Sequence, residues 1–120
     1  MVEASKASPV LVVEDDVEIR DLVREVLEDE GYAVVVAEHG REAVEALESG
    51  LSPALILLDL MMPVMDGWEL LDVLRARWSK IPVTVVSAVA DRARLGAVPF
   101  IKKPINLDTL IDAVNGVCRP

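Results

Sequence analysis

The sequence predicts an α/β fold built on a doubly wound, five-stranded parallel sheet with helices on both faces. Five short apolar runs alternate along the 120 residues with segments whose apolar residues recur at helical spacing. The runs are continuously apolar, which is typical of strands buried on both faces. A chain of this length suits one domain with its own core, so we expect a flexible leader at residues 1–8 and a single domain at 9–120.

The first half of the chain predicts two strands and two helices. The strands are the apolar runs at residues 10–13 and 33–37. Between them, residues 16–30 place their aliphatic side chains on one helical face, and Gly31 can end that helix. Residues 41–49 repeat this periodicity over a shorter length, which predicts the second helix.

The second half predicts three more strands, at residues 55–58, 83–86 and 98–101. Asp66 can cap a helix over residues 67–77, and Asn106 can cap a last helix that extends to Val117. Only about ten residues separate the fourth strand from the fifth, whereas a helical crossover usually needs a dozen or more. We therefore expect a shortened fourth helix, of at most about two turns.

Charge and cysteine content narrow the classes of function. Twenty-one acidic and twelve basic side chains give a net charge of −9, which suits neither nucleic acid nor an anionic membrane as a partner. Cys118 is the only cysteine, so no internal disulfide can form, as is usual in a reducing compartment. No apolar stretch reaches the roughly 20 residues that span a bilayer. We therefore expect a cytoplasmic protein.

Five polar side chains fall at the carboxyl ends of predicted strands. Glu14 and Asp15 follow the first strand, Asp59 the third and Ser87 the fourth, and Lys103 lies two positions beyond the fifth. In a parallel sheet these ends share one edge, where ligands bind. Three carboxylates suit a hard cation such as Mg²⁺, and an ammonium and a hydroxyl group beside them suit phosphoryl transfer to a carboxylate. Each residue alone is more simply a helix cap, a turn residue or a surface charge, but their shared position favours a site.

Four segments match a known family, in order: LVVEDD at 11–16, LLDLMMPVMDG at 57–67, VVSA at 85–88 and FIKKP at 100–104. Through them the chain resembles the receiver domain of bacterial two-component response regulators, the CheY-like superfamily. The resemblance covers nearly the whole chain after the leader. It implies a flavodoxin-like sheet with strand order 2-1-3-4-5, and a phosphoprotein of phosphorelay signal transduction that is not a turnover enzyme.

The resemblance also implies roles for the acidic residues and the lysine. Asp59 would be the phosphoacceptor and would form an acyl phosphate. Mg²⁺ would be the cofactor, ligated by Asp15, Asp59 and the backbone carbonyl of Met61, with Glu14 acting mainly through a water molecule. Lys103 would contact the phosphoryl oxygens.

Switching and partners follow from the same resemblance. Ser87 would move to hydrogen-bond the phosphoryl group, with Phe100 as its aromatic switch partner, and the peptide bond before Pro104 would be cis. The phosphodonor would be a phosphohistidine on a sensor histidine kinase or a histidine phosphotransfer protein. We expect a stand-alone regulator or phosphorelay intermediate that acts on a protein target unknown from the sequence, and not on nucleic acid or a membrane.

Some features depart from the family pattern. The span from Ser87 to Lys103 is about six residues shorter than usual, which fits the shortened helix and changes a face that family members often use for partners. Phe100 replaces the more frequent tyrosine and lacks a hydroxyl group, so we expect it to rest inward. Met61 and Val89 flank the path of the attacking water in this family, and neither can orient a water. We therefore predict a phosphoaspartate that hydrolyses slowly.

Two other functions remain open. A constitutive scaffold or interaction module would keep the receiver fold without switching. A phosphatase-type α/β enzyme with an aspartyl nucleophile would need a second acid two residues beyond Asp59, where this chain has Met61. The single histidine, His39, has no ligand partners at suitable spacing, so we interpret it as a surface loop residue. Treatment with acetyl phosphate or beryllofluoride and Mg²⁺ would distinguish the three functions. A receiver would be modified once, at Asp59, an enzyme would process substrate repeatedly, and a scaffold would not respond.

Overall fold

The structure is a computed structural model that describes residues 8–89 and 91–118. Its strands are β1 (Val10–Val13), β2 (Val34–Ala37), β3 (Leu55–Leu58), β4 (Val83–Ser87) and β5 (Phe100–Lys102). Its helices are α2 (Val17–Asp29), α3 (Gly40–Glu48), α4 (Gly67–Arg77), α5 (Arg92–Leu95) and α6 (Leu107–Cys118). None of these described helices combines the length and the apolar composition that a bilayer-spanning segment needs. Residues 1–7 of the predicted leader lie outside the described residues.

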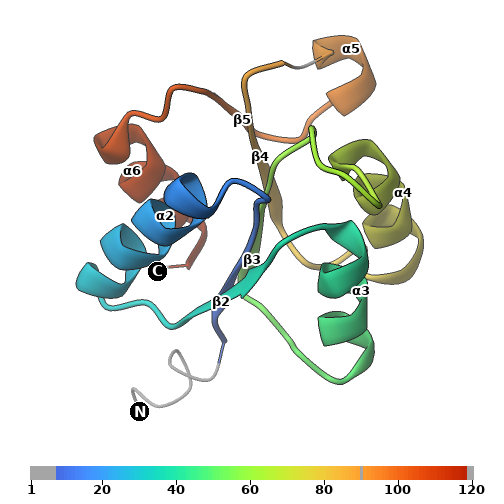
Figure 1. The fold of residues 1–120 in the computed structure, drawn as a ribbon, viewed down its shortest axis with the longest axis horizontal. Coiled ribbons are helices and arrows are strands. Elements are labelled where there is room, and N and C mark those ends of the chain that lie inside the picture. The colour runs from blue at the N-terminus through green and yellow to red at the C-terminus, as the bar shows by residue number, and fades with distance from the viewer. Residues whose placement is uncertain (1–7, 90, 119–120) are drawn as a thin grey trace.

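The strands form one parallel sheet in the order β2-β1-β3-β4-β5. Figure 1 shows α2 and α6 on one face of this sheet and α3 and α4 on the other, with α5 beyond the β5 edge. The strand order reverses between β1 and β3, as it does in doubly wound folds that bind ligands beyond the carboxyl ends of these strands. The structure thus confirms the predicted fold class and strand order.

Two apolar layers enclose the sheet because successive strand residues point to opposite faces. Val10 and Val12 of β1 belong to the layer under α2 and α6, where they join Val23, Leu27, Leu110 and Val114. Leu11 and Val13 belong to the layer under α3 and α4, where they join Ala43, Leu47, Leu70 and Leu74. All four β1 residues are therefore buried, which explains the continuous apolar run in the sequence.

The predicted helix caps are confirmed. Asp16 accepts hydrogen bonds from the backbone N–H groups of Glu18 and Ile19, and Asn106 accepts one from Thr109. Asp66 and Glu69 form a reciprocal capping box at the start of α4. After α2, Gly31 has a φ of 96°, a left-handed conformation that favours glycine. The peptide bond between Lys103 and Pro104 is cis, as expected.

The fourth crossover is short, and the fifth strand begins later than predicted. α5 has four residues, as the short spacing indicated. The predicted strand at 98–101 is wrong at its start, because β5 begins at Phe100. Val98 donates its N–H to the Leu95 carbonyl and so ends the α5 turn, and Pro99 has no N–H to donate to a neighbouring strand. The apolar run therefore includes two residues of the preceding loop.

Candidate functional site

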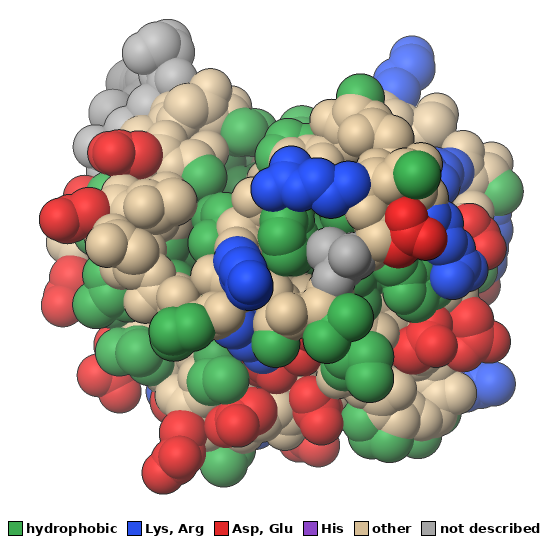
Figure 2. All heavy atoms as spheres, turned by 90° about the horizontal axis from the view of Figure 1, so that it is seen from above, with side chains coloured by type: hydrophobic (Ala, Val, Ile, Leu, Met, Phe, Trp, Pro, Cys, Tyr) green, Lys and Arg blue, Asp and Glu red, His purple; other side chains and the backbone are tan. Residues whose placement is uncertain are grey.

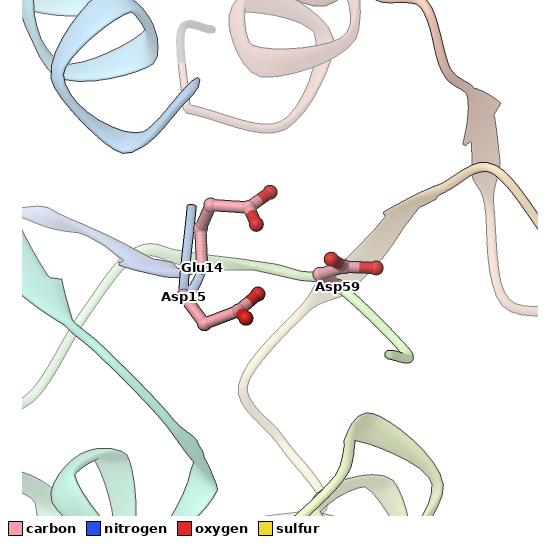
Figure 3. Close-up of side chains that lie close together, drawn as sticks. All are labelled: Glu14, Asp15 and Asp59. Carbon is pink, nitrogen blue, oxygen red and sulfur yellow. The ribbon is translucent and has the colours of Figure 1, made fainter. Parts of the chain in front are cut away.

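Parallel pairing brings the three carboxylates together at the carboxyl ends of β1 and β3. The pairing register sets Val13 opposite Leu58, so the next residues of the two strands, Glu14 and Asp59, become neighbours. Asp59 also donates its N–H to the Val13 carbonyl. Figure 3 shows Glu14, Asp15 and Asp59 around a common space. Their ligand oxygens lie within 4.8 Å of one another, and Asp15 is the exposed member.

Lys103 enters this acidic pocket from the loop after β5. Its Nζ donates a hydrogen bond of 2.7 Å to Oε1 of Glu14 and one of 3.1 Å to Oδ2 of Asp59. The side chains of the two acids are 6% and 7% exposed, so the ion pairs are shielded from solvent. An ion pair in this environment is much less screened than a surface pair. Lys103 is 89 positions from Glu14 and 44 positions from Asp59 in the sequence, and the three side chains form one charged cluster.

Burial dominates the acid–base behaviour of the pocket. The pKa of Glu14 is raised to about 7, mainly because burial removes the carboxylate from water. The charge of Asp59 also raises this pKa. The hydrogen bonds from Lys103 and from the Asp16 N–H lower it, but by less than burial raises it. Desolvation would lower the pKa of Lys103, but the hydrogen bonds to Glu14 and Asp59 and the charges of these carboxylates together raise it. The metal-free pocket therefore retains a protonated lysine and holds a proton on Glu14 more readily than an exposed glutamate would.

Backbone and guanidinium contacts hold the acidic side chains in place. The Met61 N–H donates to Oδ1 of Asp59 at 3.2 Å, so this carboxylate is held by Met61 on one oxygen and by Lys103 on the other. The Arg20 guanidinium, from the second turn of α2, donates to the Glu14 carbonyl at 3.0 Å. This role of Arg20 was not predicted from the sequence, although the position of Arg20 one helical turn after the Asp16 cap could have indicated it.

The loop after Asp59 is pressed closely against α4. A Cβ at Gly67 would lie 2.2 Å from the carbonyl oxygen of Asp59 and 2.5 Å from the Cα of Leu60. Gly67 also donates its N–H to the Leu60 carbonyl. A side chain at this position would displace the backbone that carries the central carboxylate, so glycine is required here by close approach.

Ser87 and Phe100 lie on neighbouring strands at the same side of the sheet. Ser87 ends β4 and is fully buried; its Oγ accepts a hydrogen bond from the Val89 N–H, and its carbonyl accepts one from the Lys103 N–H. Phe100 begins β5, is half-buried and packs against the apolar layer. The Arg92 guanidinium lies 5.2 Å from its ring centroid. That cation–π contact was not predicted, because it depends on where the shortened α5 lies.

Other residues lie at the rim of the acidic pocket or away from it. His39 lies in the loop between β2 and α3, as predicted, and is the N-cap of α3, where its Nδ1 accepts a hydrogen bond from the Glu42 N–H. Trp68 lies at the start of α4 and stacks under the Arg94 guanidinium at 4.2 Å. The side chains of Met61 and Val89 are each 61% exposed, although their N–H groups bind Asp59 and Ser87. Two apolar side chains therefore stand at the rim of the pocket.

The arrangement can hold a hard cation beside a nucleophilic carboxylate. Its donors are all oxygens, which suit Mg²⁺ and do not suit soft metals. Lys103 adds a positive charge that can meet an anionic group transferred to Asp59.

Known proteins resemble this chain over nearly its full length. Residues 10–115 match the family model of the response regulator receiver domain. An uncharacterized 14.6 kDa protein of Leptolyngbya boryana is 39% identical over 117 residues, which is 91% of this chain and 88% of that protein. The transcriptional regulatory protein CpxR of Escherichia coli K12 is 35% identical over 116 residues, covering 92% of this chain and 49% of CpxR. The chain spans about half the length of most of the curated relatives it matches.

Solved structures share the fold. The receiver domain of the Francisella response regulator 1452 has a TM-score of 0.84 and 31% identity, and the match covers 93% of this chain and 97% of that one. The response regulator TrrA of Thermotoga maritima, solved in complex with Mg²⁺ and BeF, has a TM-score of 0.83 and 30% identity, with 92% and 98% covered.

Proposed function

Because this chain belongs to the receiver domains of two-component response regulators, we propose that it takes a phosphoryl group from a phosphohistidine onto Asp59 and thereby switches its protein contacts. The observation that carries this proposal is the shielded cluster in which Lys103 bridges Glu14 and Asp59. A carboxylate beside a fixed ammonium at the carboxyl edge of a parallel sheet is suited to accept a phosphoryl group.

The donor set fits Mg²⁺ as the cofactor. Three carboxylates have oxygens within 4.8 Å of one another, and such a cluster is unfavourable without a cation. Asp15, Asp59 and the Met61 carbonyl would ligate the ion directly, and Glu14 would act mainly through water. When bound, the ion supplies positive charge that neutralises the transferring phosphoryl group.

The residues of the pocket divide the chemistry among them. An oxygen of Asp59 attacks phosphorus, an O–P bond forms, and the N–P bond to the donor imidazole breaks. The imidazole keeps the bonding electron pair and takes a proton as it leaves. Lys103 already donates to Asp59, so its ammonium is placed to follow the negative charge onto the phosphoryl oxygens.

The switch runs through β4 and β5. Ser87 would turn its hydroxyl group from the Val89 N–H to the phosphoryl group, and Phe100 would move with it. Since Arg92 lies over the Phe100 ring, this motion would also loosen the contact between the Arg92 guanidinium and the ring. A sensor histidine kinase or a histidine phosphotransfer protein would supply the phosphoryl group, and a protein target would read the changed surface.

Phosphorylation by acetyl phosphate with Mg²⁺ tests the proposal. Intact-mass analysis should show one phosphoryl group per chain, labile to hydroxylamine as an acyl phosphate is. Asp59→Asn should abolish this modification, whereas Asp72→Asn, at an exposed α4 position, should leave it unchanged. Equal labelling of the Asp59→Asn variant would disprove the assignment. No labelling of the parent would indicate a scaffold, and continuous phosphate release would indicate a phosphatase.

A further inference from the structure

Two hollows flank Trp78 at the amino ends of the strands. One, of about 400 Å³, lies between α4 and the segment before β5, with Leu74 and Val98 in its lining. The other, of about 540 Å³, lies between the ends of α3 and α4, with Leu51 in its lining. Both share Trp78 and Ile81, so they form one concave surface, which we call the Trp78 groove.

The shortened fourth crossover explains why this groove is open. α5 has only four residues, so residues 96–99 face α4 as a loop rather than as part of a helix. The Arg75 guanidinium donates to the Leu95 carbonyl at 3.1 Å and ties this loop to α4. The first hollow is therefore bounded by α4 on one side and by the tied loop on the other, with the half-buried Trp78 in its lining.

The groove is basic within an acidic chain. Arg75, Arg77 and Lys80 line its two hollows, and none of the described residues that line it is acidic. Arg77 lies 4.4 Å from the Trp78 ring centroid and shares its charge with Glu48 in an exposed ion pair. The stretch 73–107 holds seven of the twelve basic residues but only one of the twenty-one acidic ones.

The charge is segregated on the surface as well as in the sequence. Figure 2 looks onto the side of the molecule above α5 and β5, where basic side chains cross the middle of the face. Acidic side chains lie around them, along the lower, left and right parts of this face. Basic side chains that gather in this way attract an acidic partner to this part of the molecule.

We propose that the Trp78 groove binds an acidic segment of a protein partner, which places apolar side chains in the two hollows. The apolar lining favours a peptide over nucleic acid, because a phosphate backbone has no aliphatic groups to fill the hollows. A second copy of this chain is disfavoured by the repulsion between two molecules of net charge −9. The groove lies at the amino ends of the strands, and the acidic pocket lies at their carboxyl ends. Binding of a partner to the groove would therefore be independent of phosphorylation, and this inference goes beyond the proposed function.

Nuclear magnetic resonance titration tests this surface with a synthetic amphipathic peptide of glutamate and leucine. The expected result is salt-sensitive binding that shifts the Trp78 indole N–H and the backbone resonances of Val98 and Leu51. A lysine–leucine peptide of the same pattern and a glutamate–serine peptide should not bind. Addition of beryllofluoride with Mg²⁺ should change the affinity for the glutamate–leucine peptide by less than about twofold. Peptide binding is also expected if acetyl phosphate fails to label Asp59, so the two proposals can fail separately.

Variants connect the binding to the groove. Lys80→Glu should weaken it by at least about fivefold, and Ala97→Trp, which fills the first hollow, by about tenfold. Arg41→Glu is the matched control, since Arg41 is exposed on α3 and lines neither hollow, and should change the affinity by less than about twofold. The proposal is overturned if the acidic peptide does not bind at low salt, if Lys80→Glu and Arg41→Glu weaken it equally, or if only a DNA duplex binds.

Discussion

Lys103 donates hydrogen bonds to Glu14 and Asp59 from a side chain that is 15% exposed. Two buried carboxylates would otherwise repel each other, and the lysine offsets this repulsion in the metal-free state. Removing the lysine would leave two uncompensated acids in a shielded pocket. The same contact with Lys103, together with the Met61 N–H, holds the Asp59 carboxylate in a fixed position.

Glu14 should make the metal-free protein less stable as the pH rises. Burial raises its pKa from 4.5 to about 7, so between these values the folded chain binds more protons than the unfolded chain. Stability falls with pH wherever the folded state binds more protons, here by about 3 kcal/mol in total. Glu14→Gln removes this contribution. Urea unfolding in the presence of a chelator should therefore show that the free energy of unfolding falls more between about pH 5 and about pH 8 in the parent than in the variant.

The parent and the Glu14→Gln variant share all their other titrating groups, so the contributions of those groups to the pH dependence cancel when the two proteins are compared. If the variant lost as much stability as the parent between the two pH values, burial would not govern Glu14. Asp59 remains as a partner of Lys103 in the Glu14→Gln variant, so the lysine keeps one ion pair.

The phosphoryl group on Asp59 should be long-lived because the rim of the pocket is apolar. Met61 and Val89 donate N–H groups to Asp59 and Ser87, but the Val89 side chain has no hydrogen-bonding group and the Met61 thioether is only a weak acceptor, so neither can orient an attacking water. Met61→Asn combined with Val89→Gln should shorten the lifetime of the phosphorylated form by about tenfold in a phosphate-release assay. Val17→Asn, at a position 53% exposed at the start of α2, should have little effect. Loss within seconds in the parent would contradict the prediction.

The sequence predicted the acidic pocket because strand ends determine its geometry. Glu14 and Asp59 follow strands that pair in parallel, so their proximity needs no knowledge of rotamers. Arg20 and Arg92 were not predicted, because a flexible guanidinium can reach several groups and tertiary packing selects one. The position of His39 in a loop was predicted, but its role as the N-cap of α3 was not, because histidine is not among the common N-cap residues.

At the scale of elements, the start of α4 depends on Gly67. A methyl group there would meet the Asp59 carbonyl oxygen at 2.2 Å, so the loop or the helix must move. Gly67→Ala should cost about 2 kcal/mol of stability and also weaken Mg²⁺ binding, because the displaced backbone carries Asp59. Thermal unfolding and Mg²⁺ titration measure the two effects.

Gly116 provides the matched control in α6. A Cβ there would meet nothing within 4 Å, so Gly116→Ala should stabilise the chain by about 0.5–1 kcal/mol through helix propensity alone. Equal effects of the two substitutions would show that close approach at Gly67 is not the cause.

The elements were predictable where periodicity and caps agreed. α4 begins after Asp66 and ends at Arg77, as its capping residue and apolar spacing indicated. β5 was predicted two residues early, because apolarity alone does not show that Val98 bonds to Leu95 instead of a neighbouring strand. The shortening of α5 followed from the number of residues available, but its contacts with Phe100 and Trp68 did not.

At the scale of the whole molecule, two surfaces of opposite charge lie at opposite ends of the strands. The acidic pocket follows the carboxyl ends of β1 and β3, and the Trp78 groove precedes β4 and β5. The sheet and its two apolar layers separate these sites. A cation or phosphoryl group at one end can therefore change local contacts without occupying the surface proposed for an acidic partner.

The pocket should also link metal binding to the stability of the whole fold. A ligand that binds only the folded state stabilises it by RT ln(1 + [L]/Kd), about 1.4 kcal/mol for Mg²⁺ at ten times its dissociation constant. Asp15→Asn removes a carboxylate from the cluster and should abolish most of this gain, whereas Asp21→Asn, on the surface of α2, should keep it. Urea unfolding with Mg²⁺ and with a chelator measures the difference for each variant. Equal stabilisation of the Asp15→Asn variant and the parent would place the ion elsewhere, and the assignment of Asp15, Asp59 and Glu14 to one metal site would fail.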